Sequence, residues 1–344
     1  MKEVGIFDLY PKPFLPSKLN SMIQKLKTQF EAYRKENPLQ GEPESLYTPA
    51  DYILDLGGKR FRPILSMLSY QLFDKQVERV LPIAYALEIF HNFSLVHDDI
   101  MDAAPVRRGQ PTVHTKWGTN TAILSGDVML VLAYDYLSRF DDDHKIPSLL
   151  RVFNRVAREV CEGQEMDMAF EQRSDVRIEE YIRMIELKTS VLLATCLEMG
   201  AIAAGASPEQ VQHCYAVGRN IGIAFQLQDD LLDTFGAAEK IGKRSGGDIL
   251  QNKKTFLILK ALELANEDQR QTLERLLSTT PKDEQQKIED VKSILLDLDI
   301  PKHAQEMKNH FRSKAFEHLK AITTEAAAKE SLSGMMENLV SRDY

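Results

Sequence analysis

The 344-residue sequence contains no long apolar run, only three cysteines, and few glycines and prolines. No window of about 18 residues is both apolar and uncharged, so we expect no membrane-spanning helix. The first residues, MKEVGIFDLYPKPFLP, hold no continuous apolar stretch, which argues against a secretory signal. Because Cys161, Cys196 and Cys214 are far apart and odd in number, we expect buried free thiols rather than a metal or catalytic site, in a reducing, cytoplasmic compartment.

Positive charge is also scarce relative to negative charge. The chain has 43 Lys and Arg residues against 51 Asp and Glu residues, which gives a formal net charge of −8. This diffuse acidic balance argues against a protein that binds nucleic acid or an anionic membrane surface, since both attract cationic proteins. Taken alone, it would also argue against an anionic small substrate. The hydrophobic content of 43% and the charged content of 27% are those of an ordinary globular protein and exclude extensive disorder.

The glycines and prolines mostly separate stretches whose apolar residues recur every three or four positions, which is the period of an α-helix. Alternating runs rich in β-branched residues are missing, so the predicted fold class is all-α. Four stretches are apolar on most faces and are expected inside a large helical assembly: 81–101, 119–139, 185–204 and 214–235. Residues 17–36 and 303–326 are amphipathic and predict outer helices.

The stretch 37–49 is rich in proline and glycine and predicts a loop after an N-terminal helix. Because it separates only one helix from the rest of the chain, we expect a single domain that spans residues 1–344.

One short acidic motif occurs twice, as DDIMD at 98–102 and as DDLLD at 229–233. Each copy falls near the C-terminal end of a predicted apolar helix, where the first and fifth carboxylates lie one turn apart and can converge on one ion. Clustered carboxylates on an apolar helix are costly unless a cation neutralises them. Oxygen ligands favour Mg²⁺ or Mn²⁺, and Mg²⁺ tends to share its shell with substrate phosphates. Two facing clusters therefore imply a diphosphate between them, whereas the acidic run 141–143 predicts a solvated loop.

Basic residues accompany both motifs. They occur in GGKRFRP at 57–63, in RRGQP at 107–111, in KRSGGD at 243–248 and in the pair 253–254. Arginine binds phosphate oxygens through two parallel hydrogen bonds, and lysine adds a point charge. Any one of these groups could form an ordinary surface ion pair, but their arrangement around both acidic motifs favours phosphate binding.

Together these motifs resemble those of the trans-isoprenyl diphosphate synthases, the polyprenyl synthetase family of head-to-tail prenyltransferases. The resemblance runs from about Gly57 to Lys254 and rests on GGKRFRP, HDDIMD, RRGQPTVH, GDVML, ELKTS, FQLQDDLLD and GGDI. It implies a helical bundle around a central apolar cavity, and a cytoplasmic homodimer. It also implies Mg²⁺-dependent condensation of isopentenyl diphosphate with an allylic diphosphate, by way of an allylic carbocation.

The resemblance also implies a role for individual residues. The expected ligands of three Mg²⁺ ions, for which Mn²⁺ could substitute, are Asp98, Asp102 and Asp229. The expected additional or water-mediated ligands are Asp99, Asp230 and Asp233. The residues expected at the allylic diphosphate are Arg107, Lys188, Lys243 and Lys253. Those expected at isopentenyl diphosphate are Lys59, Arg62, His91 and Arg108, with Phe225 against its hydrocarbon tail. The residues expected to face the developing cation are Thr189 and Gln226.

The length of the product is expected to depend on Phe93 and Ser94, which precede Asp98 by five and four residues. At 1.5 Å per residue they lie about 6–8 Å below it along a helix. In the family, bulky residues there act as a floor, and two adjacent aromatic residues favour a C15 product. The pattern of one aromatic and one small residue resembles that of family members that release geranylgeranyl diphosphate (C20). The next alternative by this resemblance is farnesyl diphosphate (C15). Alternatively, Phe93 simply packs in the core and other residues set the floor.

Three alternatives stay open at this point. A class I terpene cyclase usually carries an asymmetric second motif and would leave GGKRFRP without a diphosphate to bind. A non-catalytic subunit of a heteromeric synthase typically lacks aspartates from one motif, and none is missing here. The pair Glu88 and His91 has the spacing of a di-iron bundle ligand set, but no second copy with that spacing follows.

Overall fold

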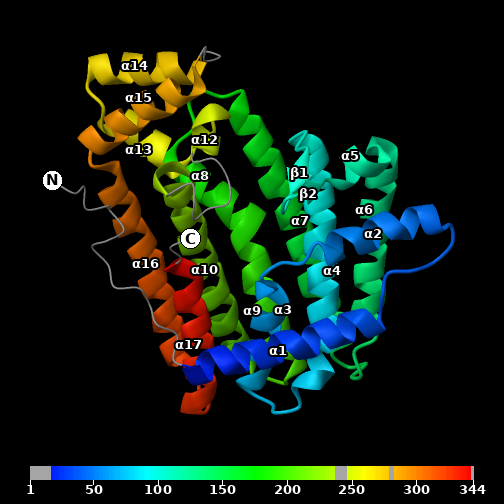
Figure 1. Ribbon diagram of the computed structural model, residues 1–344. Helices are drawn as coiled ribbons and strands as arrows, with labels where there is room; N and C mark the ends of the chain where they lie inside the picture. Colours follow the sequence, from blue (N-terminus) through cyan, green and yellow to red (C-terminus); the bar gives the residue numbers. More distant parts are fainter. Residues whose placement is uncertain (1–16, 237–245, 279–282, 342–344) are drawn as a thin grey trace.

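The computed structural model describes residues 17–236, 246–278 and 283–341 (Figure 1). These residues form helices joined by short turns, with one two-stranded ribbon in the described ranges, β1 (Val106–Arg107) paired with β2 (Gln110–Pro111). The predicted all-α fold class is confirmed. Within the same ranges, no helix is both long enough and apolar enough to cross a membrane.

Six helices of the described ranges form the centre of the bundle. They are α4 (Leu81–Met101), α6 (Thr119–Ser138), α7 (Ile146–Glu171), α9 (Val191–Ala203), α10 (Pro208–Phe235) and α16 (Ile300–Ala321). Of the four stretches predicted to be buried on most faces, the one that forms α9 is almost completely buried, whereas α6 exposes one face, with Leu124 and Val131 on it. On α9, twelve of the thirteen residues are buried, because this helix is surrounded by neighbours on all sides. Proline occupies the first turn of α7, α10 and α16, where its missing N–H would have no helical partner.

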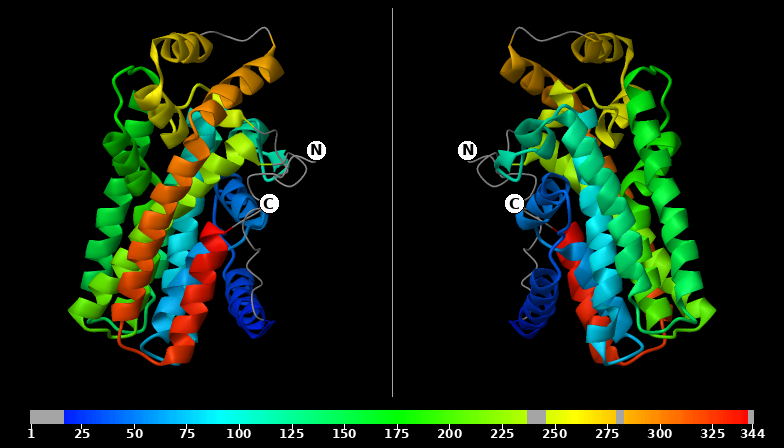
Figure 2. Two further views of the ribbon diagram at one scale, coloured as in Figure 1. Left: turned by 90° about the vertical axis from the view of Figure 1, so that its left-hand side faces the viewer. Right: turned by 90° about the vertical axis from the view of Figure 1, so that its right-hand side faces the viewer.

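Other helices pack around the central ones. Helix α1 (Ser17–Glu36) lies against the side of the bundle near one end, next to α17 (Ala326–Val340), and buries Leu26 and Phe30 (Figure 1). The other end is covered on one side by α13 (Phe256–Leu264), α14 (Glu267–Ser278) and α15 (Glu284–Asp297), and Figure 2 shows them lying across the long helices. The remaining helical segments are α2 (Glu44–Asp55), α3 (Phe61–Gln71), η2 (Val77–Val80), α5 (Val113–Trp117), α8 (Ile178–Ile185), η3 (Glu186–Ser190) and α12 (Gly247–Leu250).

The predicted loop 37–49 is too long. Helix α2 begins at Glu44, because Pro43 has an extended backbone at the N-cap and Glu44 places an acidic side chain in the first turn. Pro49 lies inside this helix and is buried. The break therefore covers only residues 37–43, where the chain turns from α1 into α2.

The predicted outer helix 303–326 is wrong at both ends. Helix α16 starts at Ile300 and ends at Ala321, where Ile322 adopts an extended backbone. The next residues are fixed by other helices, because the Thr323 amide donates to Gln210 Oε1 and the Thr324 hydroxyl donates to the Leu72 carbonyl. Helix α17 then starts at Ala326.

Two further predictions need correction. The stretch 185–204 is not one regular helix, because its first residues form the π-helical turn η3. Cys161 is exposed on α7, whereas Cys196 and Cys214 are buried as predicted, and all three are free thiols. The acidic run 141–143 lies in a turn, as predicted.

Candidate active site

The two acidic motifs lie at the C-terminal ends of α4 and α10, as the sequence predicts (Figure 1). Asp98 belongs to the last turn of α4, and Asp102 follows as its C-cap, donating its amide to the Asp98 carbonyl at 2.8 Å. Asp102 is exposed, and Asp98 and Asp229 are half-buried. Burial raises the pKa of Asp98, and the neighbouring carboxylates of Asp102 and Asp99 raise it further, against the opposing charges of Lys188 and Arg107.

Asp99 is only 1% exposed. The guanidinium of Arg107 in strand β1 grips its carboxylate, with Nε at 3.0 and 2.8 Å from the two oxygens and Nη2 at 2.8 Å from Oδ1. This pair ties the ribbon to the end of α4. In this structure Arg107, expected at the allylic diphosphate, is thus held by the first motif.

Two aspartates of the second motif also have protein partners. Asp230 is 3% exposed, accepts a hydrogen bond from the Tyr181 hydroxyl, and lies 3.4 Å from Nε2 of Gln226. Burial and the nearby charge of Asp248 raise the pKa of Asp230 to about 8, despite the hydrogen bonds it accepts. Asp233 accepts the backbone amide of Asp248 at 2.9 Å and so fixes the start of α12.

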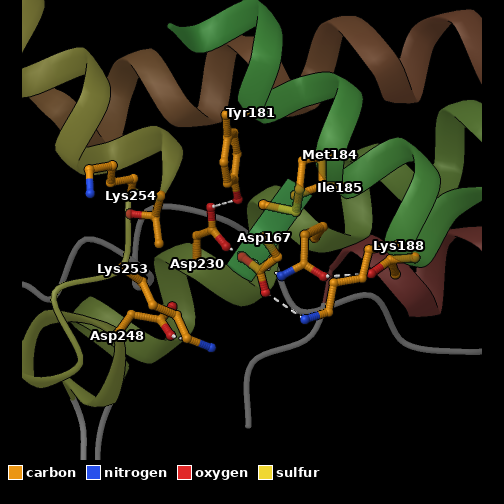
Figure 3. A pocket seen from close by; sticks show the side chains of 12 residues that line it. Asp167, Tyr181, Met184, Ile185, Lys188, Asp230, Asp248, Lys253 and Lys254 are labelled. Carbon is orange, nitrogen blue, oxygen red and sulfur yellow. Dashed lines mark hydrogen bonds and ion pairs between the residues drawn. The ribbon is translucent and has the colours of Figure 1, made fainter. Parts of the chain in front are cut away.

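A cavity of about 130 Å³ opens beside the second motif (Figure 3). Five of its lining residues are expected site residues: Lys188, Thr189, Gln226, Asp230 and Lys253. The polar lining residues that the sequence analysis did not assign are Asp167, Tyr181, Asp248, Lys254 and Thr255. Asp248 could have been found, because it belongs to the GGDI motif, whereas Asp167 is a lone acid on α7 without any pattern.

Three lysines and three aspartates line this cavity. Lys188 Nζ lies 2.6 Å from Asp167 Oδ2, and Figure 3 shows this pair facing the cavity. Burial lowers the pKa of Lys253, but the carboxylates of Asp248, Asp167, Asp102 and Asp233 outweigh it and raise the pKa overall. Lys254 instead donates to the Phe170 carbonyl at 2.7 Å, at the end of α7. The cavity can therefore hold both a multiply charged anion and the cations that neutralise it.

Thr189 and Gln226 form a polar pair on the cavity wall. The Thr189 hydroxyl donates to Gln226 Oε1 at 3.3 Å, which leaves oxygen lone pairs of both residues near the cavity. Phe225 is half-buried and packs against the core next to Gln226.

A second cavity, of about 460 Å³, has a cationic wall. It contains all four residues expected at isopentenyl diphosphate, namely Lys59, Arg62, His91 and Arg108. Arg62 Nη1 donates to Nε2 of His91 at 3.0 Å, which requires that nitrogen to carry no proton. Burial and the surrounding arginines hold the pKa of His91 well below its ordinary value, so the ring is neutral. Arg108 reaches across the opening and donates to the Gly57 carbonyl.

Arg60 lies in the same basic cluster but faces the interior of the protein. It adopts a left-handed backbone (φ 54°), is 3% exposed, and contacts Glu88 Oε1 at 2.7 Å, Glu31 Oε1 at 2.8 Å and the Leu54 carbonyl at 2.6 Å. Glu88 is thus paired with Arg60, and His91 with Arg62, so neither is arranged as a di-iron ligand. All three cations in GGKRFRP border the second cavity, but the Arg60 guanidinium is occupied by Glu88 and Glu31.

We expect Arg60→Met to lower the free energy of unfolding by about 3–5 kcal/mol, because it leaves the buried Glu88 carboxylate without its partner. Urea-induced unfolding, followed by circular dichroism, measures this loss. Lys59→Met is the matched control, because its exposed side chain lies next to Arg60 in the chain. Equal stability of the two variants would contradict a structural role for Arg60.

Phe93 lies on α4 below Asp98, as expected, and is half-buried. Its ring centroid is 4.9 Å from that of His97 and 5.6 Å from that of Phe90, which in turn rests on Phe153 of α7 at 5.3 Å. Ser94 donates its hydroxyl to the His91 carbonyl at 2.8 Å. Phe93 therefore tops a stack of aromatic rings that continues into the core.

The carboxylates of the site suit Mg²⁺ bound together with a substrate. Among the described residues, no three His, Cys, Asp or Glu side chains converge closely enough to hold an ion by themselves. Mg²⁺ commonly takes only one or two protein carboxylates and completes its shell with water and substrate phosphates, so this donor set fits it. Lys243 lies outside the described residues.

Comparisons with known proteins agree with this geometry. The family model described as "Polyprenyl synthetase" matches residues 43–295. A short chain isoprenyl diphosphate synthase from Methanocaldococcus jannaschii is 38% identical over 257 residues, which cover 75% of this chain and 76% of the relative. A geranylgeranyl diphosphate synthase from Methanosarcina mazei is 42% identical over 222 residues, which cover 64% of this chain and 68% of the relative. The crystal structure of a geranylgeranyl pyrophosphate synthase superposes with a TM-score of 0.89 at 42% identity and covers 94% of this chain and 99% of its own.

Proposed function

Since the chain belongs to the polyprenyl synthetase family and is a short-chain trans-prenyltransferase, we propose that it condenses isopentenyl diphosphate with allylic diphosphates and releases geranylgeranyl diphosphate. The observation that carries this proposal is the pairing of two different polar cavities at one end of the bundle. One is lined by lysines and carboxylates, and the other by cations around a neutral histidine.

The cavity of mixed charge is the proposed site of the allylic diphosphate. Asp98, Asp102 and Asp229 would hold three Mg²⁺ ions, for which Mn²⁺ could substitute. Bound Mg²⁺ supplies Lewis-acid stabilisation of the charge that gathers on the departing diphosphate. Lys188 and Lys253 of the cavity lining would add positive charge; in this structure they lie beside the carboxylates of Asp167 and Asp248.

The cationic cavity is the proposed site of isopentenyl diphosphate. Lys59, Arg62 and Arg108 supply charge and hydrogen-bond donors, and His91 can donate from its second nitrogen because Nε2 is occupied by Arg62. The carboxylate of Glu88 does not oppose an anion here, because Arg60 neutralises it from below.

The reaction we propose breaks the bond between the allylic carbon and the diphosphate oxygen, and the electron pair leaves with the diphosphate. The oxygens of Thr189 and Gln226 face the resulting cation and stabilise it. The double bond of isopentenyl diphosphate then forms the new carbon–carbon bond, and a proton is lost to the departed diphosphate. Apolar helices around the site exclude water, which would otherwise capture the cation.

We further propose a homodimer formed through α6. This helix exposes Leu124 and Val131 at 58% and 65% of their surface, on the side away from the core. A cytoplasmic location is part of the same proposal, because a reducing compartment maintains the three free thiols. Analytical ultracentrifugation of the protein and of Leu124→Lys tests the dimer. A monomeric wild type, or a dimeric Leu124→Lys, would contradict this interface.

One incubation distinguishes the proposed activity from its two alternatives. The purified protein is supplied with isopentenyl diphosphate, dimethylallyl diphosphate and Mg²⁺, and the products are separated by chromatography. We expect C20 diphosphate, with C15 as the next product. A hydrocarbon without diphosphate would indicate a terpene cyclase, and no product would indicate a subunit that requires a catalytic partner.

A further inference from the structure

The residues Lys188 and Thr189 lie on an irregular segment. The π-helical turn η3 (Glu186–Ser190) separates α8 from α9, and single π turns inside helices are frequent at functional sites. In this turn Lys188 faces Asp167 of α7, whereas Thr189 faces Gln226 of α10. Two consecutive residues thus contact two different helices, and all four side chains line the cavity.

Two glycines let these helices approach the turn closely. A Cβ atom on Gly163 of α7 would lie 2.7 Å from the Cα of Lys188, and a Cβ on Gly222 of α10 would lie 2.6 Å from the Cα of Ser190. Both distances are shorter than side chains tolerate, and both obstructing atoms are backbone or next to it. The turn therefore packs directly against the backbones of α7 and α10 at these two glycines.

The spacing along each helix repeats this arrangement. On α7, Gly163 and Asp167 are four residues apart. The glycine that packs against the turn and the aspartate that pairs with Lys188 therefore lie on one face of the helix. On α10, Gly222 and Gln226 are likewise four apart, and Arg219 precedes Gly222 by three. One face of α10 thus carries Gly222, which packs against the turn, Gln226, which pairs with Thr189, and Arg219.

Arg219 anchors the start of the turn. Its Nε and Nη2 each donate at 2.8 Å to one oxygen of Glu186, which is buried at the first position of η3. Arg183 on α8 adds a third hydrogen bond to Glu186 at 2.9 Å. The two-point contact with Arg219 restricts both the position and the rotation of the carboxylate, which a single hydrogen bond would not.

From these contacts we infer that Glu186 and Arg219 are positioning residues, which act through the π turn to fix Lys188 and Thr189 between α7 and α10. The inference rests on the proposed function, because it assigns Lys188 and Thr189 to the allylic diphosphate and its cation. Neither Glu186 nor Arg219 lines the cavity, so their effect on the reaction passes through the backbone of the turn. A misplacement of about 1 Å in a reacting site can cost a hundredfold in rate.

The test compares Arg219→Met with a matched variant, Arg155→Met. Arg155 also pairs with a buried glutamate, Glu198, and joins α7 to α9 without touching η3. We expect Arg219→Met to lower kcat about 10- to 100-fold while the KM for isopentenyl diphosphate stays within about twofold, because the second cavity is unaffected. Arg219→Lys keeps the charge but loses the two-point contact, so its kcat should lie between that of the wild type and that of Arg219→Met. Arg155→Met should keep kcat within about twofold of the wild type.

A second measurement does not depend on turnover. Hydrogen exchange of the 186–190 amides should be faster in Arg219→Met than in Arg155→Met, even when the two variants unfold at the same temperature. Equal kcat and equal exchange in these two variants would overturn the positioning role. If instead the wild type makes no prenyl product, the proposed function fails, and the exchange measurement alone decides whether Arg219 holds the turn.

Discussion

Replacing Asp98 by alanine is expected to lower kcat on the order of a thousandfold, and added Mg²⁺ should not restore it. Asp98 is a half-buried carboxylate in the last turn of α4, close enough to Asp102 and Asp99 for their charges to raise its pKa. A bound divalent cation relieves that repulsion and at the same time neutralises the departing diphosphate. Steady-state rates with isopentenyl and allylic diphosphates across a Mg²⁺ titration provide the measurement.

The control for this substitution is Asp143→Ala. Asp143 is exposed in the turn that follows α6, belongs to an acidic run of similar composition, and should keep normal turnover. Circular dichroism establishes that both variants are folded. Near-normal turnover of Asp98→Ala at saturating Mg²⁺ would remove Asp98 from the proposed metal ligands.

Replacing Phe93 by alanine is expected to shift the main product beyond C20. The ring of Phe93 lies on α4 somewhat more than one turn from Asp98, and it tops the stack formed with Phe90 and Phe153. Removal of this ring creates space in the direction in which a chain attached to the diphosphate must grow. Chromatography of the dephosphorylated products measures the change in length.

Phe316→Ala is the matched control. Phe316 is also a partly buried aromatic residue packed against the core, but it lies on α16. Its loss should leave the product lengths as they are in the wild type. Unchanged lengths in Phe93→Ala would mean that Phe93 is a packing residue and that other side chains form the floor.

The helical fold and the location of the site could be predicted from sequence because both depend on local patterns. Apolar spacing identified α4 and α6 nearly to the residue, whereas α10 begins six residues before the predicted stretch 214–235. The paired motifs indicated which helix ends carry the candidate site. The π turn at 186–190 could not be predicted in this way. A single extra residue in a helix that is buried all round leaves its apolar pattern almost unchanged, so the irregularity has no periodic signature.

Individual roles in the site depend on tertiary contacts that composition does not encode. Arg60 and Arg62 are two residues apart in one basic cluster and border the same cavity, yet Arg60 is 3% exposed and paired with Glu88, whereas Arg62 contacts His91. The difference follows from the left-handed backbone of Arg60, which turns its side chain inward. Likewise, Asp99 and Asp230 belong to the acidic motifs, but Arg107 and Tyr181 occupy their carboxylates.

The position of Phe93 and Asp98 on one uninterrupted helix has an evolutionary consequence. Helix α4 carries the group proposed to start the reaction near its end and the ring proposed to limit growth within its length. Mutations at the inner position can therefore change the product while the chemistry at the end is inherited unaltered. Under these proposals, a single substitution at Phe93 would change the product without removing the carboxylate of Asp98.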